Sequence, residues 1–166
     1  MQKSGHEFHL REVARLSGLS TTAAKARLKQ LEKHEIITSE KKKNLIIFKT
    51  RDTEEYREAK KLYNIQIIKN SGLLKYIGNR FRHPEAVVLF GSVARGEDTE
   101  KSDVDIFVLS SVKNEPDFSD FERKIGKKIS VIVMTPKEFG EAKKKSPEFV
   151  NNTVNGIILE GYLKVL

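Results

Sequence analysis

Two apolar runs joined by a charged loop limit the fold of this chain more than any other feature. Residues 86–90 read AVVLF and residues 104–109 read VDIFVL, and both have the length and composition of buried strands. Gly91-Ser92 ends the first run, and a polar loop leads from there to the second. The pattern therefore predicts two strands of a buried sheet with a polar connection between them.

Two carboxylates lie at the start of the second run. Side chains two residues apart in a strand point to the same face, so Asp103 and Asp105 are expected side by side. Such carboxylates repel each other unless a cation lies between them, and oxygen ligands favour Mg²⁺ or Mn²⁺. Upstream, Gly91 permits a tight turn and Ser92 offers a hydroxyl and an amide, as in turns that bind phosphate. Arg95 follows with a charge suited to phosphate, so the stretch predicts a site for a nucleoside triphosphate.

The remainder of residues 84–166 continues an alternation of strands and helices. FSDFERKIG is expected to form a helix, KISVIVM a strand, and Thr135-Pro136 the start of a further helix. A last short helix in SPEFVNNTVNG precedes an apolar tail. These residues are expected to form a mixed β-sheet with flanking helices.

Residues 1–50 show a different pattern. A short helix, a turn at Gly18, a second helix from Ser20 or Thr21 and a hairpin with a basic tip follow one another, which predicts a winged helix-turn-helix. The second helix has one apolar and one basic face, suited to the major groove of DNA, while the hairpin would contact phosphates. The residues expected to contact DNA are Thr21, Thr22, Lys25, Lys29, Lys33, Lys41, Lys42 and Lys43. Only nine residues precede Leu10, so the usual first helix is missing, is replaced by a partner subunit, or lies upstream.

Residues 51–83 are expected to form a helical connector. A capping box over 52–55 begins one helix, and Ser71-Gly72 interrupts it. A second helix carries Leu73, Ile77 and Phe81 at four-residue steps, so it is expected to pack against a core. The expected fold class is therefore α+β, with a winged helix-turn-helix, this connector and the mixed sheet in succession.

Charge and composition narrow the functions further. The net charge is +8; residues 1–50 hold 11 Lys or Arg against 5 Asp or Glu, whereas residues 84–166 hold 12 against 14. The basic excess lies towards the N-terminus, which suits a polyanionic partner there. The chain has no cysteine, which excludes disulfides and thiolate metal sites. It shows no membrane-spanning run and no signal peptide, so we expect a cytoplasmic protein with no membrane partner.

Three short pieces follow in order between and around the two strands: Gly91-Ser92, Arg95-Gly96 and Ser102-Asp103-Val104-Asp105. This order resembles the signature of the polymerase-β-like nucleotidyltransferases, and the ending EFVNNTVNGIILEG is similar to their minimal branch. The resemblance covers residues 84–166, about half of the chain. The whole arrangement is similar to archaeal-type regulators that carry a nucleotidyltransferase domain.

The resemblance implies a reaction and a set of roles. A nucleoside monophosphate would pass from an NTP to an acceptor, with release of diphosphate and with Mg²⁺ or Mn²⁺ as cofactor. Asp103 and Asp105 would be the metal ligands and the catalytic pair. The nucleotide would be held by Gly91, Ser92, Arg95, Gly96 and Ser102. Active members have a third carboxylate on the next strand, where this chain has Ser130; Asp117, Asp120 and Glu138 are alternatives among which the spacing does not choose.

Two functions remain open at this point. The first is an enzyme that transfers a nucleotide to an unknown acceptor, by family analogy a protein hydroxyl in a toxin–antitoxin pair. The second is a DNA-binding regulator whose nucleotidyltransferase-like domain senses nucleotide or mediates association, for instance as a homodimer. Ser130 favours the regulator, and the Asp103–Asp105 pair favours the enzyme.

Overall fold

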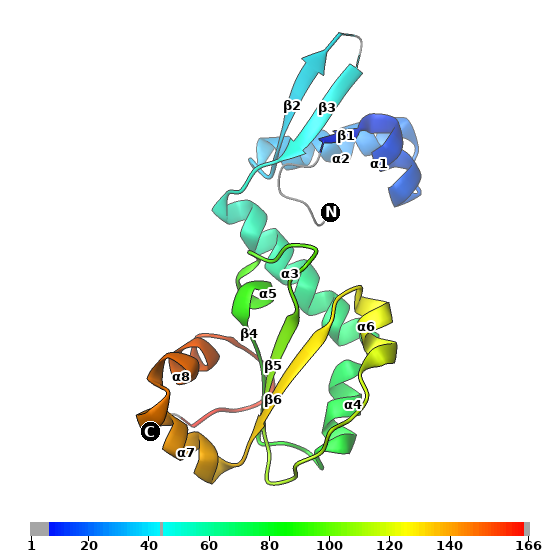
Figure 1. The fold of residues 1–166 in the computed structure, drawn as a ribbon. Helices are drawn as coiled ribbons and strands as arrows, with labels where there is room; N and C mark the ends of the chain where they lie inside the picture. The colour runs from blue at the N-terminus through cyan, green and yellow to red at the C-terminus, as the bar shows by residue number, and fades with distance from the viewer. Residues whose placement is uncertain (1–6, 44, 165–166) are drawn as a thin grey trace. The chain divides into compact units, whose positions relative to one another are not determined.

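The computed structural model describes residues 7–43 and 45–164 as helices, strands and connecting loops (Figure 1). The chain divides into two units, Met1–Lys60 and Lys61–Leu166. The boundary falls within helix α3 (Glu54–Ser71), which contributes residues to both units. Among the described residues, no helix is both long and apolar enough to cross a membrane.

The described residues of the first unit, 7–43 and 45–60, form two complete helices, the first turns of α3 and a three-stranded antiparallel sheet of order β1-β3-β2. Gly18, with φ of 66°, ends the first helix, and the Ser20 hydroxyl accepts a hydrogen bond from the Ala23 amide at the start of the second. The expected helices and hairpin are confirmed, whereas strand β1 was not expected. The elements are β1 (Glu7–His9), α1 (Leu10–Ser17), α2 (Thr21–Lys33), β2 (Ile37–Lys42) and β3 (Leu45–Thr50).

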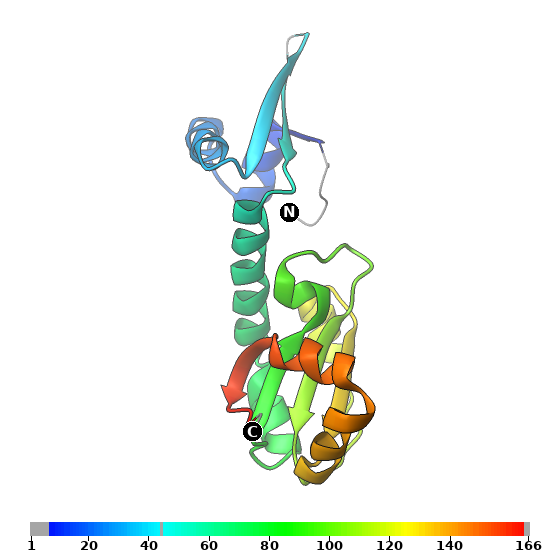
Figure 2. The ribbon, with the colours of Figure 1, turned by 90° about the vertical axis from the view of Figure 1, so that its left-hand side faces the viewer.

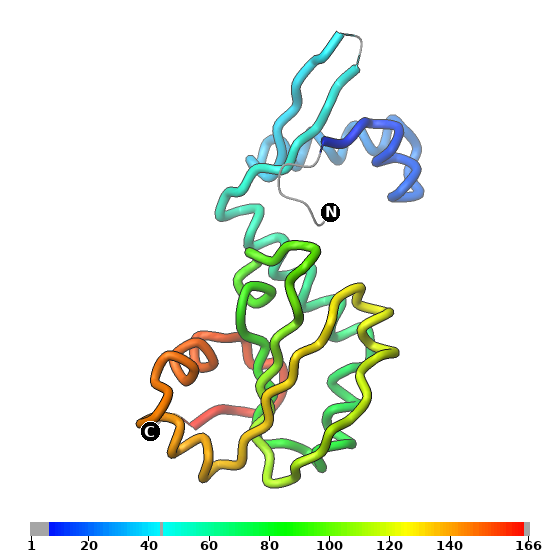
Figure 3. The backbone as a smooth tube through the Cα atoms, viewed as in Figure 1, coloured from blue at the N-terminus to red at the C-terminus, as the bar shows by residue number. Residues whose placement is uncertain are grey.

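The second unit is built on a four-stranded mixed sheet of order β6-β5-β4-β7, which Figure 3 traces as a continuous backbone. Strand β5 pairs in parallel with β6, and β4 pairs antiparallel with both β5 and β7. The strands are β4 (Ala86–Phe90), β5 (Val104–Leu109), β6 (Ile129–Met134) and β7 (Ile157–Gly161). In addition to α3, the described helices of this unit are α4 (Leu73–Arg80), α5 (Gly91–Arg95), α6 (Ser119–Ile125), α7 (Pro136–Lys145) and α8 (Pro147–Val154). The apolar tail expected after the last helix thus supplies an edge strand.

Helices cover both faces of this sheet, and alternate residues of each strand serve one face or the other. On β5, Val104, Ile106 and Val108 share a buried cluster with residues of α3, α4 and α6. Phe107 and Leu109 point the other way, into a cluster with residues of α7 and α8, the helices that Figure 2 shows in front of the sheet. Position in the strand therefore fixes which side chains meet which helices.

The second helix of the expected connector belongs to this core. Leu73, Ile77 and Phe81 of α4 and its flank have at most 1% of their surface exposed, and they pack in the same cluster as β4 and β5. The four-residue spacing read from the sequence therefore located the buried side of α4 correctly.

Candidate active site

A row of three residues crosses the sheet where β5 and β6 begin. Asp105 of β5 pairs with Phe90 of β4 on one side and with Ser130 of β6 on the other. Asp105 lies two residues before Phe107, and Ser130 lies two residues before Ile132, so each pair shares one face of its strand. Asp105 and Ser130 therefore lie on the face of the sheet that α7 and α8 cover further along. The structure therefore brings together the end of β4, Asp105 and the position expected for a third acid.

Gly91 makes room for the Asp105 carboxylate. The chain turns from β4 into α5 at Gly91 with φ of +73°, a conformation that side chains rarely adopt. A Cβ atom placed on Gly91 would come within 3.0 Å of Asp105 Oδ2. The Gly91-Ser92 turn and Asp105, one of the two expected metal ligands, are thus in direct contact, whereas the sequence pattern predicted only that one loop joins them.

Asp105 is half-buried and Asp103 is exposed beside it. Burial and the nearby Asp103 charge raise the pKa of the Asp105 carboxyl, and the Arg95 guanidinium lowers it in part. The two carboxylates therefore interact unfavourably in the free protein, and a cation held between them would relieve this repulsion. Two carboxylates together with substrate phosphates form a usual Mg²⁺ site, so these residues fit the metal that the nucleotidyltransferase resemblance implies.

The other expected nucleotide-binding residues lie on α5 and the loop after it. Ser92 is half-buried in α5, and Gly96, with φ of 69°, ends that helix. Arg95 is exposed, and its Nε pairs with Glu97 at 2.7 Å, which leaves the two terminal nitrogens of the guanidinium outside this ion pair. The Ser102 hydroxyl accepts a hydrogen bond from the Thr99 amide at 2.9 Å, which folds the loop back just before Asp103.

A hollow of about 500 Å³ opens next to Asp103, between the loop and helix α6. Lys101, Arg123 and Lys128 line it together with Glu100 and Glu122. Glu122 is held there by the amide of Ile129, which donates to its Oε1 at 2.9 Å. The hollow therefore has a wall of mixed charge on the α6 side of Asp103.

No acidic side chain takes the place of the third carboxylate in the part of the chain that the structure describes. Ser130 is exposed at that position, and no group of three or more His, Asp or Glu residues within residues 7–43 and 45–164 could hold a metal ion. Asp117 accepts hydrogen bonds from Ser119, and Asp120 pairs with Arg123. Glu138 lies beyond the opposite end of β6.

The surroundings of Glu138 explain its absence from the site. Its carboxylate caps helix α7 through the Thr135 amide and hydroxyl, and it pairs with the Lys113 ammonium. These contacts, Lys113 first among them, lower the pKa of Glu138 to about 2. The capping role follows from the Thr-Pro-Lys-Glu sequence, which was recognised as a helix start.

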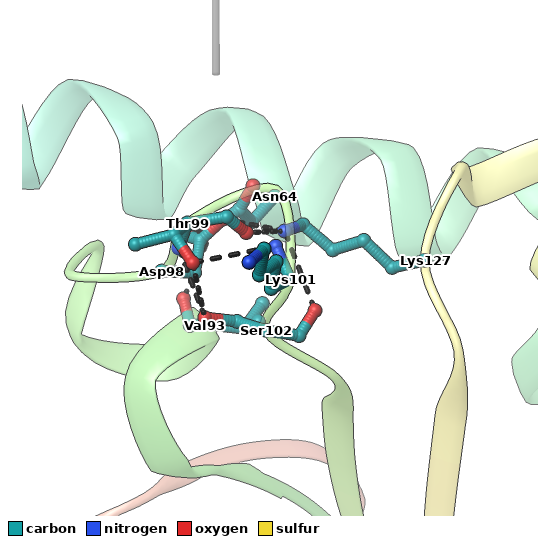
Figure 4. Close-up of polar contacts among 7 residues, drawn as sticks. All are labelled: Asn64, Val93, Asp98, Thr99, Lys101, Ser102 and Lys127. Atoms are coloured by element: carbon teal, nitrogen blue, oxygen red, sulfur yellow. Dashed lines mark hydrogen bonds and ion pairs between the residues drawn. The ribbon is translucent and has the colours of Figure 1, made fainter. Parts of the chain in front are cut away.

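A buried ion pair next to the site was not expected from the sequence. Asp98 and Lys127 meet at 3.0 Å, with side chains that are 1% and 3% exposed. Figure 4 shows Lys127 reaching Asp98 and Ser102, with Asn64 close by on the helix behind. In the sequence, both charges lie within polar segments that read as exposed loop, so the pattern carried no signal of their burial.

The residues expected to contact DNA lie on the exposed surface of the first unit. Thr21 and Thr22 lie in the first turn of α2, and its lysines recur at four-residue steps, so they share one face. Those lysines are Lys25, Lys29 and Lys33. In the hairpin, Lys41 and Lys43 are exposed, whereas Lys42 pairs with Glu7 of β1 at 3.2 Å.

Comparison with known proteins agrees with this geometry. The model of the family described as "Nucleotidyltransferase domain" matches residues 70–159, more than half of the chain. A relative from Methanocaldococcus jannaschii, named "Putative protein adenylyltransferase MJ1379", is 42% identical over 55 residues, which span 29% of this chain and 55% of the relative. The chain therefore matches little more than half the length of that protein. No solved structure matches the chain.

Proposed function

Because the chain belongs to the nucleotidyltransferase domain family, we propose that its second unit binds an NTP with Mg²⁺ or Mn²⁺ and transfers the nucleoside monophosphate to an acceptor hydroxyl. The observation that carries this proposal is the contact between the Gly91 turn and Asp105, with Asp103 beside it. It supports the proposal because turns of this kind bind phosphate and paired carboxylates suit a divalent ion. The place of work is the cytoplasm, where NTPs are made and used.

Each residue of the candidate site has a defined task in such a transfer. Asp103 and Asp105 would hold the ion, which when bound would neutralise the charge of the phosphates. Gly91 keeps the space in front of Asp105 clear. Ser130 has no charge and is no base, so the proton of the acceptor hydroxyl leaves to solvent or to a group on the acceptor.

A protein hydroxyl is the acceptor that we propose, with ATP as the nucleotide. The support is the name of the M. jannaschii relative, which describes a protein adenylyltransferase. A partner protein, such as the toxin of a toxin–antitoxin pair, would then carry the modified side chain.

The proposal is tested by measuring diphosphate release from each of the four NTPs with Mg²⁺ or Mn²⁺. The parent chain is compared with Asp105→Asn, and labelled nucleotide is followed into the protein itself and into cell extract. Asp120→Asn is the matched control, because Asp120 is an exposed aspartate of α6 that pairs with Arg123. Metal-dependent release that is lost only in Asp105→Asn supports the enzyme, and equal release from both variants contradicts the site.

A second function is favoured by Ser130 and by the first unit together. The unit has the strand–helix–helix–hairpin order of a winged helix-turn-helix, and its exposed lysines on α2 form one face. We therefore propose, as the alternative, a DNA-binding regulator in which nucleotide occupies the second unit without turnover.

DNA binding separates the alternative from the first proposal. Affinity for the DNA upstream of the gene should fall steeply with salt, because each phosphate contact releases counterions. The pair Lys25→Ala and Lys29→Ala should abolish this binding, whereas the exposed pair Lys137→Ala and Lys144→Ala should not. A flat salt dependence in the parent chain contradicts DNA binding.

A further inference from the structure

The loop between α5 and β5 sets the position of Asp103. Residues 97–99 and 102–103 have no regular secondary structure, and residues 100–101 form a turn. A segment of this kind has many conformations of similar energy unless other contacts fix it. Asp103 has no strand partner of its own, since the paired residues of β5 begin at Val104. The geometry of the carboxylate pair therefore depends on what holds the loop.

The ammonium group of Lys127 holds the loop at three points. It pairs with Asp98 Oδ2 at 3.0 Å and donates to the Thr99 carbonyl, and the Ser102 carbonyl lies at 3.5 Å (Figure 4). One ammonium therefore makes an ion pair with a carboxylate and two hydrogen bonds to backbone carbonyls of the same loop. The last of them belongs to the residue that immediately precedes Asp103.

Helix α3 holds the same loop through Asn64. The Asn64 side-chain amide donates to Asp98 Oδ1 at 2.9 Å and to the Val93 carbonyl of α5 at 3.2 Å. Asn64 is itself buried, with 7% of its surface exposed. The two oxygens of Asp98 thus connect α3 with Lys127, two residues before β6, and Asn64 adds α5, the helix that begins at Gly91.

We propose that this buried network of Asn64, Asp98 and Lys127 is a positioning device for the metal-binding carboxylates. It fixes the backbone at Ser102 and thereby the direction from which Asp103 reaches the ion beside Asp105. None of the three touches the reacting atoms, so they are positioning residues and not catalytic ones. The inference rests on the proposed function of the second unit, since it assigns to Asp103 the role of a metal ligand.

A charge-neutral double variant, Asp98→Asn with Lys127→Met, tests the inference. Removing both members of a buried ion pair avoids leaving one charge unpaired, and the net charge near the site is unchanged. The probe is Mn²⁺ alone, with binding followed by electron paramagnetic resonance on the full chain. Loss of outer-shell support typically weakens metal binding by about 10- to 100-fold, so a dissociation constant at least about tenfold higher is expected.

Hydrogen exchange gives a second readout that does not depend on metal binding. Amides of residues 97–103 should exchange faster in the double variant, while those of β5 keep the parent rates. Lys127→Arg retains the charge and several donors, and it should recover part of the Mn²⁺ affinity. Lys144→Met is the control: it removes an exposed lysine of α7 that lies outside the network and outside the hollow beside Asp103, so Mn²⁺ binding should be unchanged.

The outcomes separate this inference from the proposed function. If the parent chain binds no Mn²⁺, the proposed function fails and the inference fails with it. If the parent binds Mn²⁺ and the folded double variant binds equally well, the inference alone is overturned. If the double variant does not fold, Asn64→Ala decides, because it leaves the ion pair in place and should still weaken Mn²⁺ binding; unchanged binding in Asn64→Ala then overturns the inference.

Discussion

Replacement of Gly91 by alanine tests the contact on which the candidate site rests. The left-handed backbone at Gly91 strains any side chain, and the new Cβ would also meet Asp105 Oδ2 within 3.0 Å. Gly126 offers a matched control, because its φ is +76° but a Cβ there meets nothing within 4 Å. The two substitutions share the backbone strain and differ in the contact with Asp105.

The expected magnitudes follow from these two terms. Left-handed strain should lower the free energy of unfolding by about 1–2 kcal/mol in both Gly91→Ala and Gly126→Ala. Overpacking against the carboxylate should lower it by about 1–3 kcal/mol more in Gly91→Ala only. Asp105 Cβ would be 3.4 Å from the new methyl, an ordinary contact, so truncating Asp105 to alanine removes the clash.

Urea unfolding followed by far-ultraviolet circular dichroism measures these differences. The four proteins are the parent, Gly91→Ala, Asp105→Ala and the double variant, with Gly126→Ala alongside. The cycle should give a favourable coupling of about 2 kcal/mol between the two substitutions, since contacting residues do not act independently. Gly91→Ala should also weaken Mn²⁺ binding, because the carboxylate must turn away to admit the methyl group.

Equal destabilisation by Gly91→Ala and Gly126→Ala, with no coupling to Asp105→Ala, would refute this reasoning. It would mean that the Asp105 carboxylate does not lie against Gly91. The Gly91 turn and the carboxylates would then be separate features, and the argument for a joint phosphate and metal site would fail.

Three further predictions concern single charges. Asp105→Asn should raise the free energy of unfolding at neutral pH, because the raised pKa of Asp105 means that folding disfavours the ionised carboxylate. This gain in stability should shrink as the pH falls through the raised folded-state pKa towards the ordinary value of 3.8, and urea unfolding at a series of pH values measures it. The ionised Glu138 carboxylate has the opposite effect on stability, because its folded-state pKa is lowered to about 2 and it therefore stabilises the fold above pH 4.5. The parent should have a higher free energy of unfolding than Glu138→Gln in the same assay, and this difference should decline from pH 4.5 towards 2. Ser130→Asp should tighten Mn²⁺ binding and increase diphosphate release, because it places a third carboxylate in register with Asp105; unchanged binding would contradict that placement.

The sequence predicted the parts of the fold that depend on local patterns. Short apolar runs predicted β4, β5 and β6, and Thr135-Pro136 predicted the start of α7. The capping box over 52–55 was wrong in detail. Helix α3 begins at Glu54, the Thr53 hydroxyl accepts from the Tyr56 amide, and Asp52 pairs with Arg57 instead.

Long-range contacts could not be predicted in the same way. Strands β1 and β7 have no strong strand pattern in their own sequences. They form through pairing with distant segments, β1 (three residues) with β3 and β7 with β4. Burial of Asp98 and Lys127 follows from how the loop packs between α3 and β6, which local sequence does not encode. The register of Ser130 with Asp105 agrees with the expected position of the third acid.

In the proposed function, metal binding depends on Asp103 and Asp105, whereas turnover also depends on what accepts the proton of the acceptor hydroxyl. Burial and the Asp103 charge disfavour the Asp105 anion in the free fold. A divalent cation held beside Asp103 would reverse the sign of that contribution, so the pair would stabilise a loaded state. Ser130 carries no charge, so it would supply neither a third carboxylate for the ion nor a base for the acceptor proton. The enzyme and the nucleotide sensor therefore share one binding site and differ in whether the acceptor brings its own base. For this reason, Mn²⁺ and nucleotide binding test the site itself, and only diphosphate release distinguishes between the two functions.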